Sequence, residues 1–241
     1  MMTRSQTAAW AGGKITGLGI WGARGESADS LADRTGALLA TLDAVLGTRQ
    51  WLLTDDRPFP SEPAARAATV EEFVSRDAHG DLTPDAGVSF ALFSGETEVA
   101  VTLEFFVGTA FPTRRVAPNR VVVELVPANP EALSPSAVDA VLDGVVSAWS
   151  PMSAAFRNSA LASASQGRGG YAPVVGYRTW VSRQVGAVAT VTDGLKLRAN
   201  DEGSLITAQD DWSADQVAAA VLATLERNGI STIPQTPPAT P

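Results

Sequence analysis

Apolar residues recur along the chain at two different spacings, and each spacing predicts its own kind of element. In residues 97–107, Val99, Val101 and Leu103 alternate with polar or smaller side chains, which is the pattern of a half-buried strand. The apolar run at 88–93 precedes this strand across a short turn, so we expect an antiparallel hairpin. Further strands are expected at 15–21, 121–125, 174–182, 187–192, 195–198 and 204–207.

Apolar residues spaced three and four apart predict helices in four places. The first helix begins at Ser27 or Ser30, whose hydroxyl can accept from a free backbone N–H group, and it ends at Gly47. The last helix has the clearest start, because Ser213 and Gln216 form a capping box. The other two are expected at 64–76 and 135–150, and the last helix ends near Gly229.

Strands joined by hairpins and mixed with helices predict an α+β fold, in which a mainly antiparallel sheet packs with three to four helices. At 241 residues the chain can bury a substantial core as a single domain, which we expect at residues 14–231. Residues 1–13 are small and polar and are expected to be disordered. The proline-rich residues 232–241 are expected to form a flexible tail.

Composition narrows the classes of protein that fit. The chain has no cysteine, which excludes a disulfide framework and a thiol nucleophile and favours a reducing compartment. It shows neither a signal peptide nor a segment long and apolar enough to span a membrane, so we expect a cytoplasmic protein. The net charge of -8 disfavours direct nucleic-acid binding. This negative excess either attracts a basic partner or merely aids solubility.

Residues that commonly carry catalysis are sparse. The only histidine, His79, has no identifiable nucleophile or acid partner, so an ordinary loop residue is the simpler interpretation. Asp77 and Asp81 flank it at alternate positions, but surface loops produce such possible metal ligands by chance. Arg168, in the glycine-rich QGRGG segment, offers a contact for an anion, although a flexible loop is the simpler interpretation. We therefore expect no catalytic site, no metal and no cofactor.

Large aromatic residues are more informative. Trp51 lies between a helix and the acidic segment TDDRPFP, where an exposed indole would resemble an interface hot spot and a buried one would belong to the core. Arg24 and Glu26 are expected to form a hydrogen bond that fixes a strand–helix junction, in preference to an active-site pair. Three tryptophans follow apolar segments and are expected in the core: Trp21, Trp149 and Trp180.

Short motifs follow one another in a distinctive order. A strand ending at Trp21 precedes Arg24, Glu26 and Ser27; after a helix and Trp51 come PNRVVVELVP, SAWSP, VGYRTWVS and GSLITAQDDW. Across residues 15–230 this order resembles the immunity protein 52 family, bacterial proteins encoded beside polymorphic toxins. The chain departs from that family at Phe93, where a tryptophan is expected. The motif positions, which we expect to be structural, are Trp21, Arg24, Glu26, Ser27, Asn119, Trp149, Pro151, Gly176, Tyr177 and Trp180.

The resemblance implies a non-enzymatic protein that binds and occludes a cognate toxin domain, in that family often a nuclease, encoded by an adjacent gene. A nuclease surface must be basic to hold nucleic acid, which suits an acidic inhibitor. A secretion chaperone or adaptor, a small-molecule-binding enzyme and a homodimer stay open as alternatives. The candidate partner-binding residues are Trp51, Asp55, Asp56, Asp201, Glu202, Asp210 and Asp211.

Overall fold

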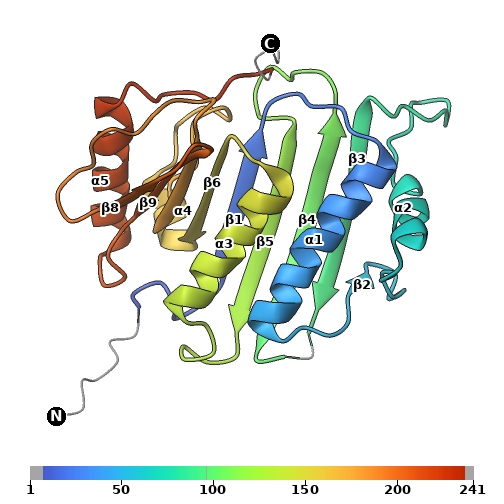
Figure 1. The fold of residues 1–241 in the computed structure, drawn as a ribbon, viewed down its shortest axis with the longest axis horizontal. Helices are drawn as coiled ribbons and strands as arrows, with labels where there is room; N and C mark the ends of the chain where they lie inside the picture. The colour runs from blue at the N-terminus through green and yellow to red at the C-terminus, as the bar shows by residue number, and fades with distance from the viewer. Residues whose placement is uncertain (1–7, 96, 237–241) are drawn as a thin grey trace.

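The fold is built on one long antiparallel sheet. The structure is a computed structural model that describes residues 8–95 and 97–236. Within those residues nine strands pair in the order β2-β3-β4-β5-β1-β6-β7-β9-β8, and every neighbouring pair is antiparallel (Figure 1). The strands are β1 (Ile15–Trp21), β2 (Leu52–Leu53), β3 (Ala86–Ser94), β4 (Val99–Thr109), β5 (Asn119–Pro127), β6 (Ser153–Asn158), β7 (Arg178–Ser182), β8 (Lys196–Ala199) and β9 (Gly203–Thr207).

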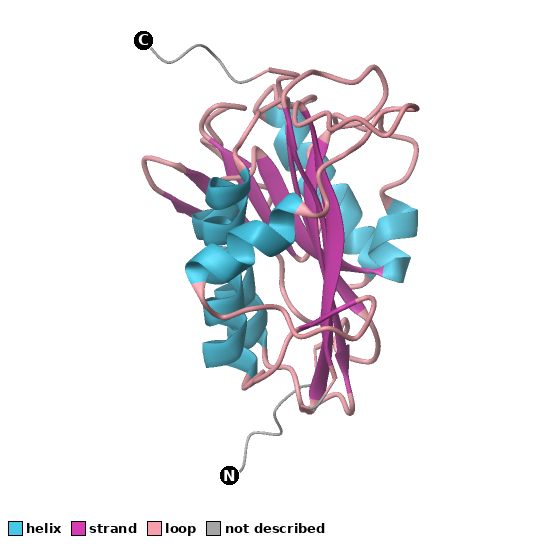
Figure 2. Cartoon of the chain, turned by 90° about the vertical axis from the view of Figure 1, so that its right-hand side faces the viewer, coloured by secondary structure: helices cyan, strands magenta, loops and turns pink. Residues whose placement is uncertain are grey.

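Five helices in the described residues cover parts of both faces of this sheet (Figure 2). In Figure 1, α1 and α3 lie side by side in front of the central strands, α2 lies at the β2–β3 end, and α4 and α5 lie behind β6, β7 and β9. The single α+β domain with a mainly antiparallel sheet is confirmed, with one helix more than expected. The helices are α1 (Ala28–Leu46), α2 (Pro63–Glu71), α3 (Pro135–Trp149), α4 (Ser159–Ala164) and α5 (Ala214–Arg227).

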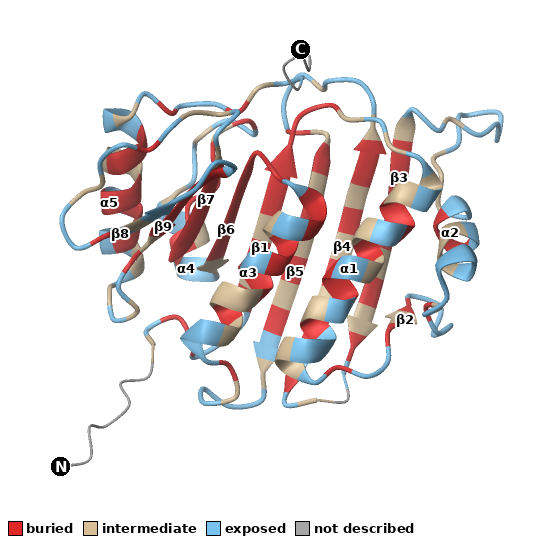
Figure 3. Ribbon diagram, in the orientation of Figure 1, coloured by how far each residue is buried: buried red, intermediate tan, exposed pale blue. Residues whose placement is uncertain are grey.

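Alternation along the strands decides which side chains face the helices. Buried residues alternate with partly exposed residues along β4 and β5, as Figure 3 shows. On the side that faces the helices, β3, β4, β1 and α3 each contribute one ring to a row of aromatic side chains. Phe90 and Phe105 stack with centroids 4.6 Å apart, Phe105 lies 5.5 Å from Trp149, and Trp149 stacks on Trp21 at 5.8 Å. This row is the centre of the core.

The predicted ends of α1 and α5 are confirmed. Ser27 caps α1 by accepting from the backbone N–H of Ser30, and Gly47 ends α1 in the left-handed region at φ 70°. The capping box of Ser213 and Gln216 is present at the start of α5. At the end of α5, the N–H of Ile230 donates to Leu225 and that of Gly229 to Glu226, each at 2.9 Å, which is the Schellman arrangement.

The strand predicted at 187–192 is wrong. This segment runs irregularly along the end of α5, and side chains there replace a neighbouring strand as its hydrogen-bond partners. The Asn228 carboxamide accepts from the N–H groups of Ala189 and Thr190 and donates to the Thr190 carbonyl, and the Thr224 hydroxyl accepts from Thr192. An apolar, β-branched run therefore forms no strand.

Other differences concern element boundaries. The helix expected at 64–76 ends at Glu71, because residues 74 and 76 form bridges with Val88 and Leu82 instead. The first part of the strand expected at 174–182 is irregular, and β7 begins only at Arg178. Strand β6 and helix α4, which follow Pro151, were not predicted, and part of the SGE turn (residue 96) lies outside the described residues.

Both chain ends contribute to the fold further than expected. Trp10 is buried at 3% exposure and its indole N–H donates to Asp210, so the disorder predicted for 1–13 is wrong for residues 8–13. Ile233 is 2% exposed, and the carbonyl of Gln235 accepts from Ala23, so residues 232–236 are not a free tail. The rest of both predictions, residues 1–7 and 237–241, lies outside the described residues.

No helix among the described residues combines the length and hydropathy needed to cross a membrane.

The close approach of α1 and α3 depends on a glycine. A Cβ placed on Gly144 of α3 would lie 2.6 Å from Cγ2 and 3.1 Å from Cβ of Thr41 on α1. Threonine is branched at Cβ and has few alternative rotamers in a helix. The Thr41 side chain therefore cannot rotate away from the added methyl group. A larger residue at 144 must therefore push the two helices apart.

We expect Gly144→Ala to lower the free energy of unfolding by about 1–3 kcal/mol through overpacking, although alanine favours helices by about 1 kcal/mol. Urea unfolding followed by circular dichroism measures the change. Gly36→Ala on α1 is the matched control, because the nearest atoms to its Cβ belong to the guanidinium of Arg66, the far end of a long side chain. The control is expected to be neutral or stabilising. Adding Thr41→Ala should recover most of the loss; an additive double variant would contradict the steric explanation.

Candidate functional site: a groove beside α3

Among the five helices of the described residues, α3 alone lies on the front side of β7, β9 and β8 in Figure 1. A groove lies between α3 and the β8–β9 hairpin. A hollow of about 780 Å³ lies at the base of the hairpin, lined among others by Ser136, Lys196 and Thr207. A second hollow, of about 430 Å³, lies at its tip, lined by residues that include Trp180 and Glu202. Strand β8, at the border of the groove, pairs only with β9 among the residues that the structure describes.

Strand register arranges the floor of the groove in rows. Arg178 of β7 pairs with Thr207 of β9, which pairs with Lys196 of β8. The next row that points the same way is Trp180, Leu205 and Arg198. The floor therefore presents cationic side chains beside an indole and a leucine.

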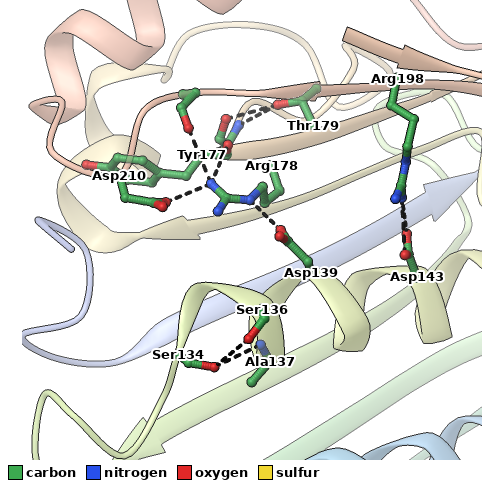
Figure 4. Close-up of polar contacts among 12 residues, drawn as sticks. Ser134, Ser136, Ala137, Asp139, Asp143, Tyr177, Arg178, Thr179, Arg198 and Asp210 are labelled. Carbon is green, nitrogen blue, oxygen red and sulfur yellow. Dashed lines mark hydrogen bonds and ion pairs between the residues drawn. The ribbon is translucent and has the colours of Figure 1, made fainter. Parts of the chain in front are cut away.

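Two ion pairs connect the strands of the groove to α3, one from β7 and one from β8 (Figure 4). At the base, Nε of Arg178 lies 2.5 Å from Oδ1 of Asp139, and Nη1 of Arg178 lies 2.9 Å from Oδ1 of Asp210. One turn further along α3, Asp143 accepts from Arg198 at 2.8 and 3.1 Å. Both pairs hold the hairpin side against α3, but they differ in exposure.

The Arg178 side chain is only 3% exposed, whereas those of Arg198 and Asp143 are 66% and 54% exposed. Burial alone would lower the pKa of Arg178, but its hydrogen bonds with Asp210 and Asp139 raise the pKa above the ordinary value of arginine. Arg178 therefore stays charged and depends on its two carboxylates. Asp210 also accepts from the indole of Trp10 at 3.0 Å, which ties the N-terminal turn to the same cluster.

The groove brings together three of the acidic residues proposed to bind a partner. Asp210 lies at the base, where it is an internal ion-pair residue and not the free surface carboxylate expected. Asp201 and Glu202 lie exposed at the hairpin tip, with Asp201 3.6 Å from Arg183. Asp211 is exposed in the turn before α5.

The remaining partner candidates lie at the opposite end of the sheet. Trp51 is only 6% exposed and its indole donates to Asp43 at 2.9 Å, so its role as an exposed interface residue is wrong. Asp55 is exposed, and its hydrogen bond with Arg57 lowers the pKa of its carboxyl group. Asp56 is exposed in the same turn, at φ 64°.

Arg24 and Glu26 form the expected hydrogen bond at the β1–α1 junction, at 3.0 Å. Arg34, which was not predicted to take part, lies 2.5 Å from the other oxygen of Glu26. Arg24 then donates to the carbonyl of Trp149 at 2.9 Å, and Arg34 donates to that of Ala148 at 2.7 Å. Arg34 lies on α1, eight residues after Glu26. That spacing is the one feature of the sequence that could have indicated the Arg34–Glu26 ion pair.

The other motif positions also make internal contacts. The buried Asn119 carboxamide donates to the carbonyls of Gly22 and Thr109 and accepts from the N–H of Thr109. Tyr177 donates to the carbonyl of Trp212, and the indole of Trp180 donates to that of Pro151. Gly176 lies so close to the Phe156 carbonyl that no side chain fits there.

The loop around His79 shows no arrangement typical of catalysis. His79 is exposed, and its backbone N–H donates to Asp77 within a tight turn. Among residues 8–95 and 97–236, no group of three or more histidines and carboxylates is placed to hold a metal ion.

We expect Asp139→Asn to lower the free energy of unfolding by about 1–3 kcal/mol, since it leaves the buried Arg178 with a single carboxylate. Asp143→Asn, four residues later on the same helix, is the matched control and should cost less than about 1 kcal/mol, because its ion pair is exposed. Urea unfolding of both variants in the same buffer makes the comparison. Equal losses would contradict the structural role assigned to Arg178.

Comparison with known proteins bears on the fold alone. No family model and no curated protein matches the chain. Among solved structures the chain is similar to one titled "Pseudomonas aeruginosa T6SS protein PA0821", with a TM-score of 0.51 and 8% sequence identity. The alignment covers 91% of this chain and 74% of that one. The resemblance of the motifs to the immunity protein 52 family therefore stays a prediction.

Proposed function

We propose that this chain is a non-catalytic binding protein that neutralises a partner toxin domain, and that the groove beside α3 is its contact surface. The observation that carries the proposal is the groove between α3 and the β8–β9 hairpin, whose outer border is the edge strand β8. A sheet face with a neighbouring helix on one side and a free edge strand on the other offers both side-chain pockets and unpaired backbone groups. A polypeptide segment of a partner can occupy both.

The chemistry of the groove suits a protein partner. Its lining combines an apolar floor, which includes Trp180 and Leu205, with charged residues of both signs along its borders. Such a mixture favours specificity, because a mismatched partner must bury unpaired charges. The charged residues of the two hollows are Asp139, Arg178, Arg183, Lys196, Arg198, Asp201, Glu202 and Asp210.

The acidic excess of the protein lies elsewhere. Residues 54–85 hold eight carboxylates and three arginines, and so account for -5 of the total charge of -8. These residues connect β2 to β3 and include α2, at the end of the sheet opposite the groove. In this proposal that region speeds the encounter with a basic toxin, and the groove determines how long the complex lasts.

Two likenesses support the choice of a toxin as partner. The order of motifs resembles a family of immunity proteins encoded beside toxins, and the similar solved structure is titled a T6SS protein. A secretion-related role unites the two. The alternative of a chaperone or adaptor predicts binding without protection, so the deciding experiment must score both.

Co-expression with the toxin domain encoded beside this gene is expected to give host survival and a complex that co-purifies. Binding without survival would favour the adaptor. Death of the host with soluble protein and no complex would contradict the immunity proposal for that partner.

Exchanging two charges along the groove tests its role without altering net charge. We expect Lys196→Glu with Glu202→Lys to raise the dissociation rate at least about tenfold, equivalent to about 1.4 kcal/mol, with little change in association rate. Both residues are exposed, so the fold should be retained. Surface plasmon resonance measures both rates.

Arg49→Glu with Glu98→Lys is the matched control, since it exchanges two exposed charges outside the groove. The control should bind as the unaltered protein does. A groove variant with unaltered kinetics, beside a weakened control, would place the interface elsewhere.

A further inference from the structure

A separate hollow lies on the sheet face opposite α1 and α3, and the proposed function makes no use of it. Leu18 and Ile20 of β1 line it; they alternate with Gly19, whose Cβ would face Val145 of α3, so they point away from that helix. The hollow encloses about 240 Å³. That volume is below the range of sites for drug-sized ligands and fits a small metabolite.

Two loop segments, 113–117 and 168–175, wall this hollow and are fixed to each other and to the sheet. Val116 and Gly170 form a parallel bridge, and the N–H of Ala117 donates to the Gly170 carbonyl at 3.0 Å. The N–H of Val174 donates to the buried hydroxyl of Ser153 on β6 at 3.0 Å. The walls are therefore a constructed part of the fold.

Three arginines line the hollow, and no carboxylate does. Arg120 comes from β5, Arg157 from β6 and Arg168 from the glycine-rich loop. This concentration of positive charge stands out in a chain with 26 acidic and 18 basic residues. We call this hollow the arginine pocket.

Among the described residues, no carboxylate forms an ion pair with any of the three guanidinium groups. Arg120 lies over the ring of Phe106, with its Cζ 3.8 Å from the centroid, and Arg168 donates to the carbonyl of Pro173 at 2.7 Å. Arg157 makes no side-chain hydrogen bond and no ion pair within 4.0 Å among the described residues. Burial lowers the pKa of both Arg157 and Arg168, as expected for charges removed from water without an anion nearby.

Three other arginines with little exposed side-chain surface have carboxylate partners, whereas the partly buried Arg66 has only the carbonyl of Ser61 among the described residues. Arg24 and Arg34 share Glu26, and Arg178 has two aspartates. Arg120 packs on Phe106 and Arg168 supports the wall, but a half-buried guanidinium without a counter-charge weakens the fold. Stability alone therefore does not explain three of them around one hollow. An anion from solution would supply the missing charge.

We propose that the arginine pocket binds a small phosphomonoester. Guanidinium groups match phosphate oxygens in geometry and bind them with paired hydrogen bonds. A phosphomonoester carries up to two negative charges, which suits three arginines better than a single carboxylate does. The apolar lining, including Leu18, Ile20 and Val175, accommodates the organic part of the ligand.

Isothermal titration of the full-length chain with phenyl phosphate, inorganic phosphate and benzoate, at constant ionic strength, tests the chemistry. Phenyl phosphate is expected to bind at least about tenfold more tightly than either of the others, because inorganic phosphate lacks the apolar part and benzoate carries only one negative charge. Benzoate binding as tightly as phenyl phosphate would overturn the assignment of phosphate. No heat of binding with any of the three would overturn the pocket itself.

Variants of the arginines test the location. Arg157→Gln is expected to weaken phenyl phosphate binding at least about tenfold while leaving the Tm of the ligand-free protein unchanged or higher, because it removes an unpaired buried charge. Arg120→Gln provides a second, independent variant. Arg168 is left intact, since it also supports the wall through Pro173.

Arg49→Gln, an exposed arginine that does not line the pocket, is the control and should bind as the unaltered protein does. Equal binding by Arg157→Gln and the control would overturn the proposal. The groove variant Lys196→Glu with Glu202→Lys should bind phenyl phosphate normally, so failure here and failure of the toxin-binding proposal remain distinguishable.

Discussion

One carboxylate, Glu26, determines how the helices sit on the sheet. The last carbonyls of α3 have no partners within that helix, because Ser150 turns into the left-handed region and Pro151 follows. Two guanidinium groups donate to these carbonyls, where cations also suit the helix dipole, and Glu26 holds both guanidinium groups. Since Glu26 lies between β1 and α1, the same ion cluster links the central strand, α1 and the end of α3. The position of α3 in turn defines one wall of the groove.

The aromatic row makes this arrangement rigid. Trp21 stacks on Trp149 directly beside the Glu26 cluster, and Arg24 lies 4.8 Å above the Trp21 ring. Both indole N–H groups lack a partner among the described residues, so shape and stacking, not hydrogen bonding, fix these rings. Gly144 lets α3 approach α1 over the row. A core built this way tolerates little displacement of α3, which keeps the groove beside it open.

Local patterns in the sequence predict local features of this protein. Helix caps such as Ser27 and the Ser213 box follow from side chains a few residues apart, and the β3–β4 hairpin follows from alternation. Features that depend on distant partners were missed. The 187–192 run looks like a strand, but Asn228 supplies its hydrogen bonds, and Asp210 looks like a surface acid, but Arg178 and Trp10 enclose it. The groove and the arginine pocket both arise from such long-range pairing, so only their separate residues, Asp201 and Arg168 among them, were visible beforehand.

The two proposed sites occupy opposite faces of one sheet, and this separation has a consequence. A ligand in the arginine pocket and a partner in the groove do not compete for space. The two sites are nevertheless connected, because β6 carries Arg157 and pairs with β7, which carries Arg178. Arg178 has its counter-charges within the chain and stabilises the groove at all times, whereas Arg157 lacks one and is neutralised only when an anion binds. The same residue type, on adjacent strands, therefore serves structure on one face and ligand binding on the other, and the presence or absence of a neighbouring carboxylate distinguishes the two roles.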